Sequence, residues 1–143
     1  MSTKDLKALE RLAQEAFNKG KASALAFMDE RFATNVVSHY ADGTETRGLK
    51  DSKQSNSIFY DAFPDMHWTI DDMIVEGDKV AVRYKWSGTH KGEFMGIPPT
   101  NKKVTIWQMS IHQIVGGKLV ESWALFDNLS VMQQLGIIPK REK

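Results

Sequence analysis

The spacing of apolar residues predicts that the first third of the chain is mainly helical. A first helix is indicated by residues that recur every three or four positions, namely Leu6, Leu9, Ala13, Ala16 and Phe17. Gly20 ends this helix, and a second, shorter one follows over residues 22–28. A third helix is predicted over residues 49–63, and Pro64 closes it.

The pattern changes from a helical period to alternation after Pro64. Extended segments are predicted over residues 35–40, 66–76, 80–90, 104–115 and 119–126, and a last helix over residues 129–136. Glycine-containing turns after positions 76 and 115 join neighbouring segments as antiparallel hairpins. Residues 1–143 therefore read as a single α+β domain with helices on one face of a curved sheet. A curved sheet wrapped around a helix forms a cone with an open mouth, which suits a small-molecule pocket.

Composition narrows the classes of function. The chain has 143 residues, a net charge of +1 and no cysteine, so nucleic-acid binding has no electrostatic support and thiolate chemistry is excluded. No apolar run approaches the roughly 20 residues that span a bilayer, and the first residues lack the apolar core of a signal peptide. We therefore expect a cytoplasmic protein that acts without membrane or nucleic acid.

Asp127 is the first candidate for catalysis. Alternation places it on the same side of the last predicted strand as Trp123 and Leu125. A carboxylate held against apolar walls is costly to ionise, which suits it to proton transfer. The alternative is that Asp127 caps the helix that follows, because Asp is a preferred N-cap residue. Asn128 can cap equally well, which would leave Asp127 free for chemistry.

His90 is the second candidate. It ends a predicted strand on the side that also carries Tyr84 and Trp86, so its imidazole is expected at the rim of an apolar pocket. The alternative is a structural histidine bonded to a backbone carbonyl of the next loop. That loop contains apolar residues that could cover a hydrophobic ligand or simply span the sheet edge, namely Phe94, Met95 and Ile97.

Tryptophans on the predicted strands offer a lining for a flat, ring-containing ligand. Trp86, Trp107 and Trp123 all lie on long strands, although a core position is the commoner place for tryptophan. The four histidines lack the short spacing of a metal-ligand pair, and neither a nucleophile elbow nor a glycine-rich phosphate loop occurs. Proton chemistry in a hydrophobic pocket, with no metal and no cofactor, is the expectation that remains.

Two runs of sequence resemble a known family. GTHKGEFMGIPPTNKKV and GGKLVESWALFDNLSVMQQLG are similar to the SnoaL-like polyketide cyclase (ester cyclase) family, within the NTF2-like (cystatin-like) superfamily of α+β cones. The resemblance covers residues 63–136, and the helical first third agrees in layout. It implies that Asp127 is the catalytic acid/base and that His90 assists it. It also implies ring closure by intramolecular aldol condensation without metal or cofactor.

The resemblance also has departures. Ser38 stands near the position of a pocket asparagine of the cyclases, Asn101 replaces a glycine, and Gln113 replaces a basic residue. The side chains expected to contact the substrate are Ser38, Phe59, Tyr84, Trp86, Phe94, Met95, Ile97, Trp107 and Trp123.

Three functions compete at this point. The first is an acid/base enzyme on a hydrophobic carbonyl compound, a cyclase or an isomerase, and the second is a non-catalytic binding or interaction protein. The third is a hydrolase with an Asp-Arg-Asp arrangement, for which Arg83 is the only arginine on the long strands. A homodimer through the sheet is expected, because three short helices cannot cover the side that bears Trp107 and Met109.

Overall fold

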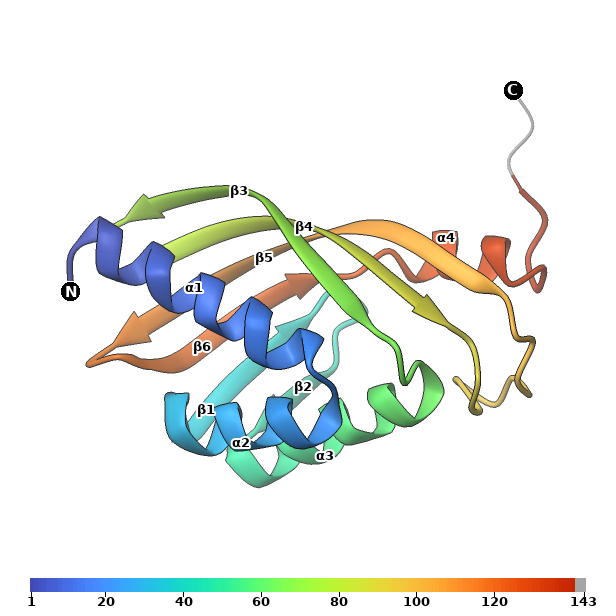
Figure 1. The fold of residues 1–143 in the computed structure, drawn as a ribbon, viewed down its shortest axis with the longest axis horizontal. Helices are drawn as coiled ribbons and strands as arrows, with labels where there is room; N and C mark the ends of the chain where they lie inside the picture. The colour runs from blue at the N-terminus through green and yellow to red at the C-terminus, as the bar shows by residue number, and fades with distance from the viewer. Residues whose placement is uncertain (141–143) are drawn as a thin grey trace.

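The computed structural model describes residues 1–140 and confirms an α+β fold with a curved, mainly antiparallel sheet (Figure 1). Its elements are α1 (Thr3–Asn18), α2 (Lys21–Arg31), β1 (Phe32–Tyr40), β2 (Glu45–Arg47), α3 (Leu49–Ala62), β3 (His67–Glu76), β4 (Lys79–Thr89), β5 (Lys103–Val115), β6 (Lys118–Leu125) and α4 (Asn128–Gln134). The six strands lie in the order β2-β1-β6-β5-β4-β3. One pairing, β1 with β6, is parallel, and it joins the early strand to the last one.

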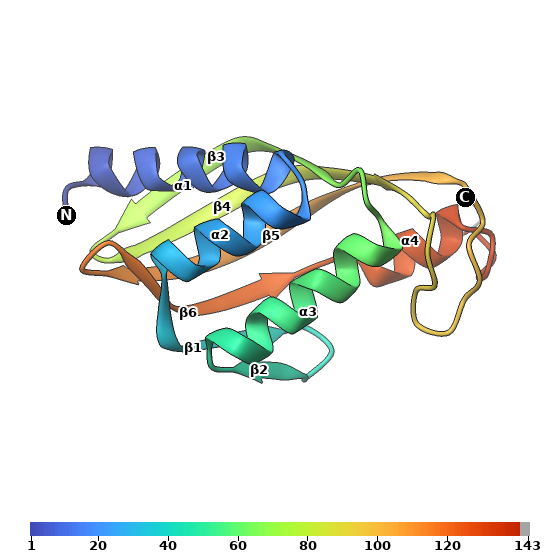
Figure 2. The ribbon, with the colours of Figure 1, turned by 60° about the horizontal axis from the view of Figure 1, so that its bottom comes forward.

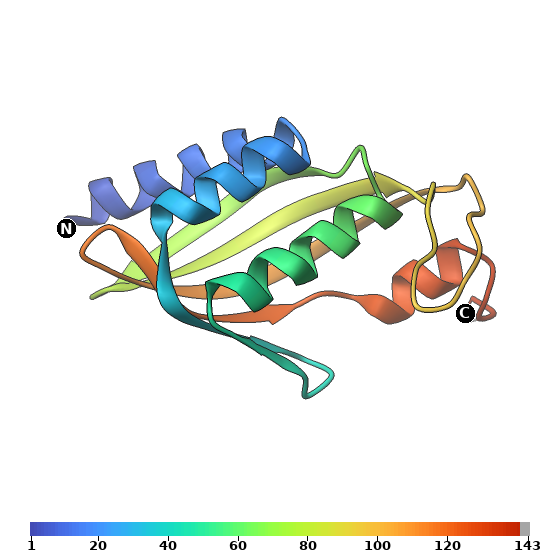
Figure 3. The ribbon, with the colours of Figure 1, turned by 90° about the horizontal axis from the view of Figure 1, so that it is seen from below.

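The first three helices lie along one side of the sheet (Figures 2 and 3). Alternation along β4 and β5 therefore divides their side chains cleanly. Val82 and Tyr84 point to the helical side and are buried, whereas Trp107, Met109 and Ile111 point outward and are exposed. No helix within residues 1–140 has both the length and the apolar composition needed to cross a membrane.

Helix α1 is fixed at both ends. At its start, the Ser2 hydroxyl accepts a hydrogen bond from the backbone N–H of Asp5, whose carboxylate accepts one from the Ser2 N–H. Near its end, Asn18 exchanges two hydrogen bonds of 2.8 Å with the backbone of Trp68. The Gln14 side chain accepts from the N–H of Ile70 at 2.6 Å. These bonds satisfy the outer backbone groups of the edge strand β3 and hold α1 in register with the sheet.

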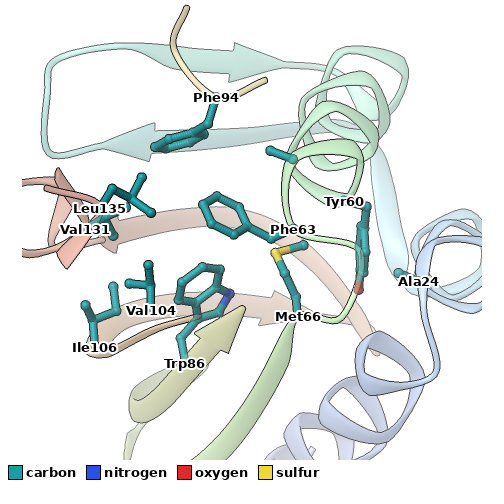
Figure 4. Close-up of a cluster of buried hydrophobic side chains, with 11 residues drawn as sticks. Ala24, Tyr60, Phe63, Met66, Trp86, Phe94, Val104, Ile106, Val131 and Leu135 are labelled. Atoms are coloured by element: carbon teal, nitrogen blue, oxygen red, sulfur yellow. The ribbon is translucent and has the colours of Figure 1, made fainter. Parts of the chain in front are cut away.

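The core consists of two clusters. One lies between α3, α4 and the far end of the sheet, and is built on the aromatic rings of Tyr60, Phe63, Trp86 and Phe94 (Figure 4). The other lies between α1 and the sheet, and includes Leu6 and Tyr84.

Strand β6 contains a bulge that corrects one prediction. Ile114 pairs with Leu119, but Gln113 pairs with Glu121, so Val120 has no partner in the ladder. An extra residue reverses the alternation that follows it. Leu119 is therefore buried, whereas Trp123 is exposed. The prediction that Leu119 shares a side with Trp123 and Leu125 is wrong.

Candidate functional site

A cavity of about 190 Å³ lies between the first three helices and the inner face of the sheet. Its helical side and the strand β3 contribute aromatic rings, among them Phe17, Phe27 and Trp68. Its floor on the sheet carries small polar side chains, among them Ser38, Ser110 and Ser122. The cavity thus has an aromatic wall facing a hydroxyl wall.

A carboxylate and an imidazole meet inside this cavity. Glu10 of α1 is only 4% exposed, and its Oε1 lies 2.6 Å from Nδ1 of His112 on β5. A buried carboxylate at this distance accepts a hydrogen bond from Nδ1–H, which fixes the orientation of the ring. Nε2 of His112 makes no hydrogen bond within residues 1–140, so it is the ring atom available to a ligand.

The pKa of His112 is raised. Burial by itself lowers the pKa, but the negative charge of Glu10 and the hydrogen bond to it outweigh that effect. Tyr84 lines the same cavity and is influenced by the same carboxylate. Burial first, and then the charge of Glu10 and a hydrogen bond to it, raise the pKa of Tyr84 well above its usual range. Tyr84 therefore stays protonated, and the hydrogen bond of Glu10 goes to His112.

His112 is also one of three polar side chains that form a row across the sheet, with Ser122 and Ser38. Ser38 is the register partner of Ser122 across β1 and β6, and Ser122 is the partner of His112 across β6 and β5. The Ser122 hydroxyl donates to the Ser38 hydroxyl at 2.8 Å. Both serines are buried and line the cavity. A ligand in the cavity therefore meets the hydroxyl of Ser38, whose hydrogen is free to be donated, and the free nitrogen of His112.

Two of the residues expected to contact the substrate, Ser38 and Tyr84, do line this cavity. Asp127 does not. It is exposed at the N-terminus of α4, and its Oδ1 accepts a hydrogen bond from the N–H of Ser130 at 3.0 Å. The apolar walls expected around it are missing, because the bulge turns Trp123 and Leu125 to the outer face. Asp127 therefore occupies the helix-capping position that was the alternative.

His90 is fully buried, but it does not line this cavity either. Its Nδ1 accepts a hydrogen bond from the N–H of Thr100 at 3.2 Å, and its ring packs against Phe63. The contact with Thr100 fixes the loop between β4 and β5 at the far end of the sheet. The prediction that Asp127 and His90 open into the same cavity is wrong.

The remaining predicted contact residues lie elsewhere. Trp86, Phe94 and Phe59 pack together in the aromatic core cluster, with ring centroids 5.6 to 5.9 Å apart around Phe59. Trp107 and Trp123 are on the outer face of the sheet, where they are 60% and 37% exposed. In the loop, Met95 is exposed and Ile97 is half-buried. None of these side chains lines the cavity.

Neither Glu10 nor His112 was predicted as a pocket residue from the sequence. A signal existed for Glu10, because it falls on the helical face marked by Leu6, Leu9 and Ala13, where a charge is out of place. His112 shares its side of β5 with Ser110, a side that is polar where a core strand would be apolar. A charged residue on an apolar helix face and a polar strand side together indicate a lined pocket.

Metal binding and the hydrolase arrangement gain no support from this geometry. No group of three histidine, aspartate or glutamate residues within residues 1–140 is placed to hold a metal ion. Arg83 pairs with Asp71 and Asp72, which gives an Asp-Arg-Asp arrangement. These three side chains do not line the cavity.

Comparison with known proteins places the chain in a family. The family model of the SnoaL-like polyketide cyclases matches residues 7–135. No curated protein matches the sequence.

Solved structures agree with this match. IdmH from Streptomyces antibioticus, a candidate polyketide cyclase, is 31% identical, with 92% of this chain and 98% of IdmH covered and a TM-score of 0.78. AclR from Streptomyces galilaeus, a candidate hydroxylase, is 28% identical over 96% of this chain and 100% of AclR, with a TM-score of 0.84.

A protein with a ketosteroid isomerase-like fold from Catenulispora acidiphila is 14% identical, with 94% of this chain and 97% of that protein covered and a TM-score of 0.74. At that identity it supports the fold alone. The family match spans nearly the whole described structure. The chain belongs to the SnoaL-like polyketide cyclase family.

Proposed function

We propose that this chain is a cyclase-like acid/base enzyme for a hydrophobic carbonyl compound, in which His112 transfers the proton. The observation that carries the proposal is the contact of 2.6 Å between Glu10 and Nδ1 of His112 inside the cavity. A carboxylate on one ring nitrogen orients the other toward the substrate and stabilises the imidazolium that forms when it takes a proton.

The proposed reaction begins when neutral His112 removes a proton from the carbon next to a carbonyl group. The electron pair moves onto the carbonyl oxygen, where the hydroxyl of Ser38, which accepts from Ser122, can donate to the developing negative charge. The carbanion carbon then attacks a second carbonyl of the same molecule and closes a ring. The His112 imidazolium returns its proton to the new alkoxide. Return of the proton to another carbon instead would give an isomerisation.

Exchange of carbon-bound hydrogen tests this proposal without knowledge of the natural substrate. Small β-dicarbonyl compounds are incubated with the protein in D₂O, and loss of the α-proton is followed by NMR. His112→Gln should slow the enzyme-dependent exchange by about a hundred- to ten-thousand-fold, the usual contribution of general acid/base catalysis. His67→Gln is the matched control, because His67 is exposed on β3 and does not line the cavity. Full exchange activity in His112→Gln would refute the assignment.

A non-catalytic binding protein is the second candidate. Glu10, the one carboxylate among the cavity-lining residues of the described chain, is already engaged by His112. If His112 stays charged at working pH, the cavity holds no free base. Parent protein that binds β-dicarbonyl compounds but exchanges no proton would favour this second function.

We also propose a homodimer formed through the outer face of the sheet. Large apolar side chains gather there with substantial exposure, namely Trp107, Met109, Ile111, Trp123 and Leu125. Monomeric proteins rarely leave a contiguous apolar surface of this kind in water. A second copy that presents the same face would cover it.

A further inference from the structure

We infer that the cavity takes a small monoanionic carbonyl compound, about one ring in size, whose carboxylate group binds Arg31. The inference rests on the site proposed above and adds the charge and the size of its ligand.

The volume of the cavity sets the size. A cavity of about 150 Å³ holds a benzene molecule, and pockets for drug-sized ligands span roughly 300–1,000 Å³. The cavity here measures about 190 Å³. It therefore suits a single ring with short substituents, and a system of several fused rings would not be enclosed. The aromatic wall of Phe17 and Phe27 and the opposite serine wall fit a flat ring with oxygen substituents.

Arg31 supplies the charge. It is the last residue of α2, lines the cavity and is partly exposed. Among residues 1–140 its partner within salt-bridge distance is Glu30, its chain neighbour, and their atoms lie 3.8 Å apart, which is too long for a hydrogen bond. The guanidinium lies beside the β5–β6 turn, where Gly117 has no side chain that could cover it.

The other charges of the cavity do not neutralise Arg31. The ionisable side chains that line the cavity are Arg31, Glu10 and His112, together with the phenols of Tyr40 and Tyr84. Glu10 already accepts from His112, so its charge is used there. A guanidinium binds a carboxylate through two parallel hydrogen bonds, a geometry that few other groups match. A carboxylate on the ligand would complete this part of the site, while its carbonyl faces His112 and the serine pair.

Binding measurements test the inference independently of turnover. The probes are salicylate, a single ring with a carboxylate, its neutral analogue salicylamide, and anthraquinone-2-carboxylate, which carries the same charge on three fused rings. Quenching of Trp68 fluorescence reports binding, because Trp68 lines the cavity, whereas Trp86, Trp107 and Trp123 do not. Trp68→Phe should abolish the signal and so identifies its source.

Salicylate should bind the parent at least about tenfold more tightly than salicylamide, as expected for a charge-assisted hydrogen-bonded pair. Arg31→Gln should remove this preference. Arg47→Gln should keep it, because Arg47 lies on β2, pairs with Glu45 and does not line the cavity. Anthraquinone-2-carboxylate should not quench Trp68.

Three results would overturn the inference. They are equal affinity of the parent for salicylate and salicylamide, an unchanged preference in Arg31→Gln, and binding of the three-ring probe in the cavity. Failure of salicylate to bind at about 10 mM, far weaker than an ordinary ligand, would also overturn it. The proposed proton transfer could still hold in each case, because it is judged by His112→Gln and not by these affinities.

Discussion

At the scale of single residues, the contact between Glu10 and His112 decides the character of the cavity. A buried charged pair costs desolvation energy and is stable only when both partners are present. Here the charge of the carboxylate also acts on Tyr84, whose pKa is raised first by burial and then by Glu10. Glu10 therefore acts through His112, as the residue that orients and charges it.

The pair makes stability depend on pH. Because the pKa of His112 is raised in the folded chain, protonation of its ring favours the folded state. This contribution is complete below the unfolded value of about 6.5 and is lost as the pH rises through the raised folded pKa. Glu10→Gln should remove that dependence. Urea unfolding of both proteins between about pH 6 and pH 9 should show their difference in unfolding free energy shrinking as the pH rises. A difference that grows with pH would contradict the assigned direction.

Asp127 gives a second prediction at this scale. Asn caps helices as well as Asp, so Asp127→Asn should change neither the melting temperature nor the proton exchange of the parent. Asp127→Ala removes the acceptor for the Ser130 N–H and should cost about 1 kcal/mol in urea unfolding. If Asp127→Asn instead loses a hundredfold or more of the exchange rate while melting like the parent, the chemistry belongs to Asp127 after all.

At the scale of elements, the sequence predicted most helices and strands but not every side-chain direction. The grouping of side chains on β4 and β5 into two sides was correct, because alternation runs through both strands without interruption. The choice of Trp107 as a pocket residue was not, because its side of β5 is the exposed one. The predicted sides of the β6 residues were wrong after Val120, because the bulged residue is an ordinary valine and no local sequence pattern marks the bulge. The parallel pairing of β1 with β6 joins residues about 84 positions apart, such as Ser38 and Ser122, and no local pattern reveals it.

The loop between β4 and β5 yields the third prediction. The N–H groups of Lys91 and Gly92 both donate to the carbonyl of Ala62 at the end of α3. A Cβ at position 92 would lie 2.2 Å from the backbone oxygen of Asp61, so the loop or the helix end must move. Gly92→Ala should therefore destabilise the fold by about 1–3 kcal/mol, as overpacking does. Lys91→Ala, at an exposed position in the same loop, is the control in urea unfolding. Parent-like stability of Gly92→Ala would show that this contact yields easily.

At the scale of the whole molecule, the sheet separates two environments. Its inner face carries the two core clusters and the cavity, and its outer face carries exposed rings such as Trp107 and Trp123. The sequence predicted the layers, because apolar periodicity reports burial. It did not predict the contact between Glu10 and His112, because these residues are 102 positions apart and meet only in the folded chain.

The outer face gives the fourth prediction. The parent should sediment as a dimer at micromolar concentration, and Trp107→Lys should sediment as a monomer, because a buried lysine without a partner opposes association. Leu12→Lys is the control, since Leu12 is an exposed apolar residue on α1, away from this face. A monomeric parent would contradict the homodimer, and a dimeric Trp107→Lys would place the interface elsewhere.

The unpaired Val120 has a consequence for which side chains reach the cavity. Beyond that valine, each residue of β6 faces the side opposite to the one that strict alternation assigns it. A regular ladder that kept Val120 paired would instead turn Trp123 and Leu125 to the inner face in place of Ser122 and Ala124, filling the cavity with large side chains. Loss of the Val120 codon would remove the bulge and leave Ser122 and Ala124 on the inner face. One extra residue in the strand thus decides which half of β6 the cavity receives.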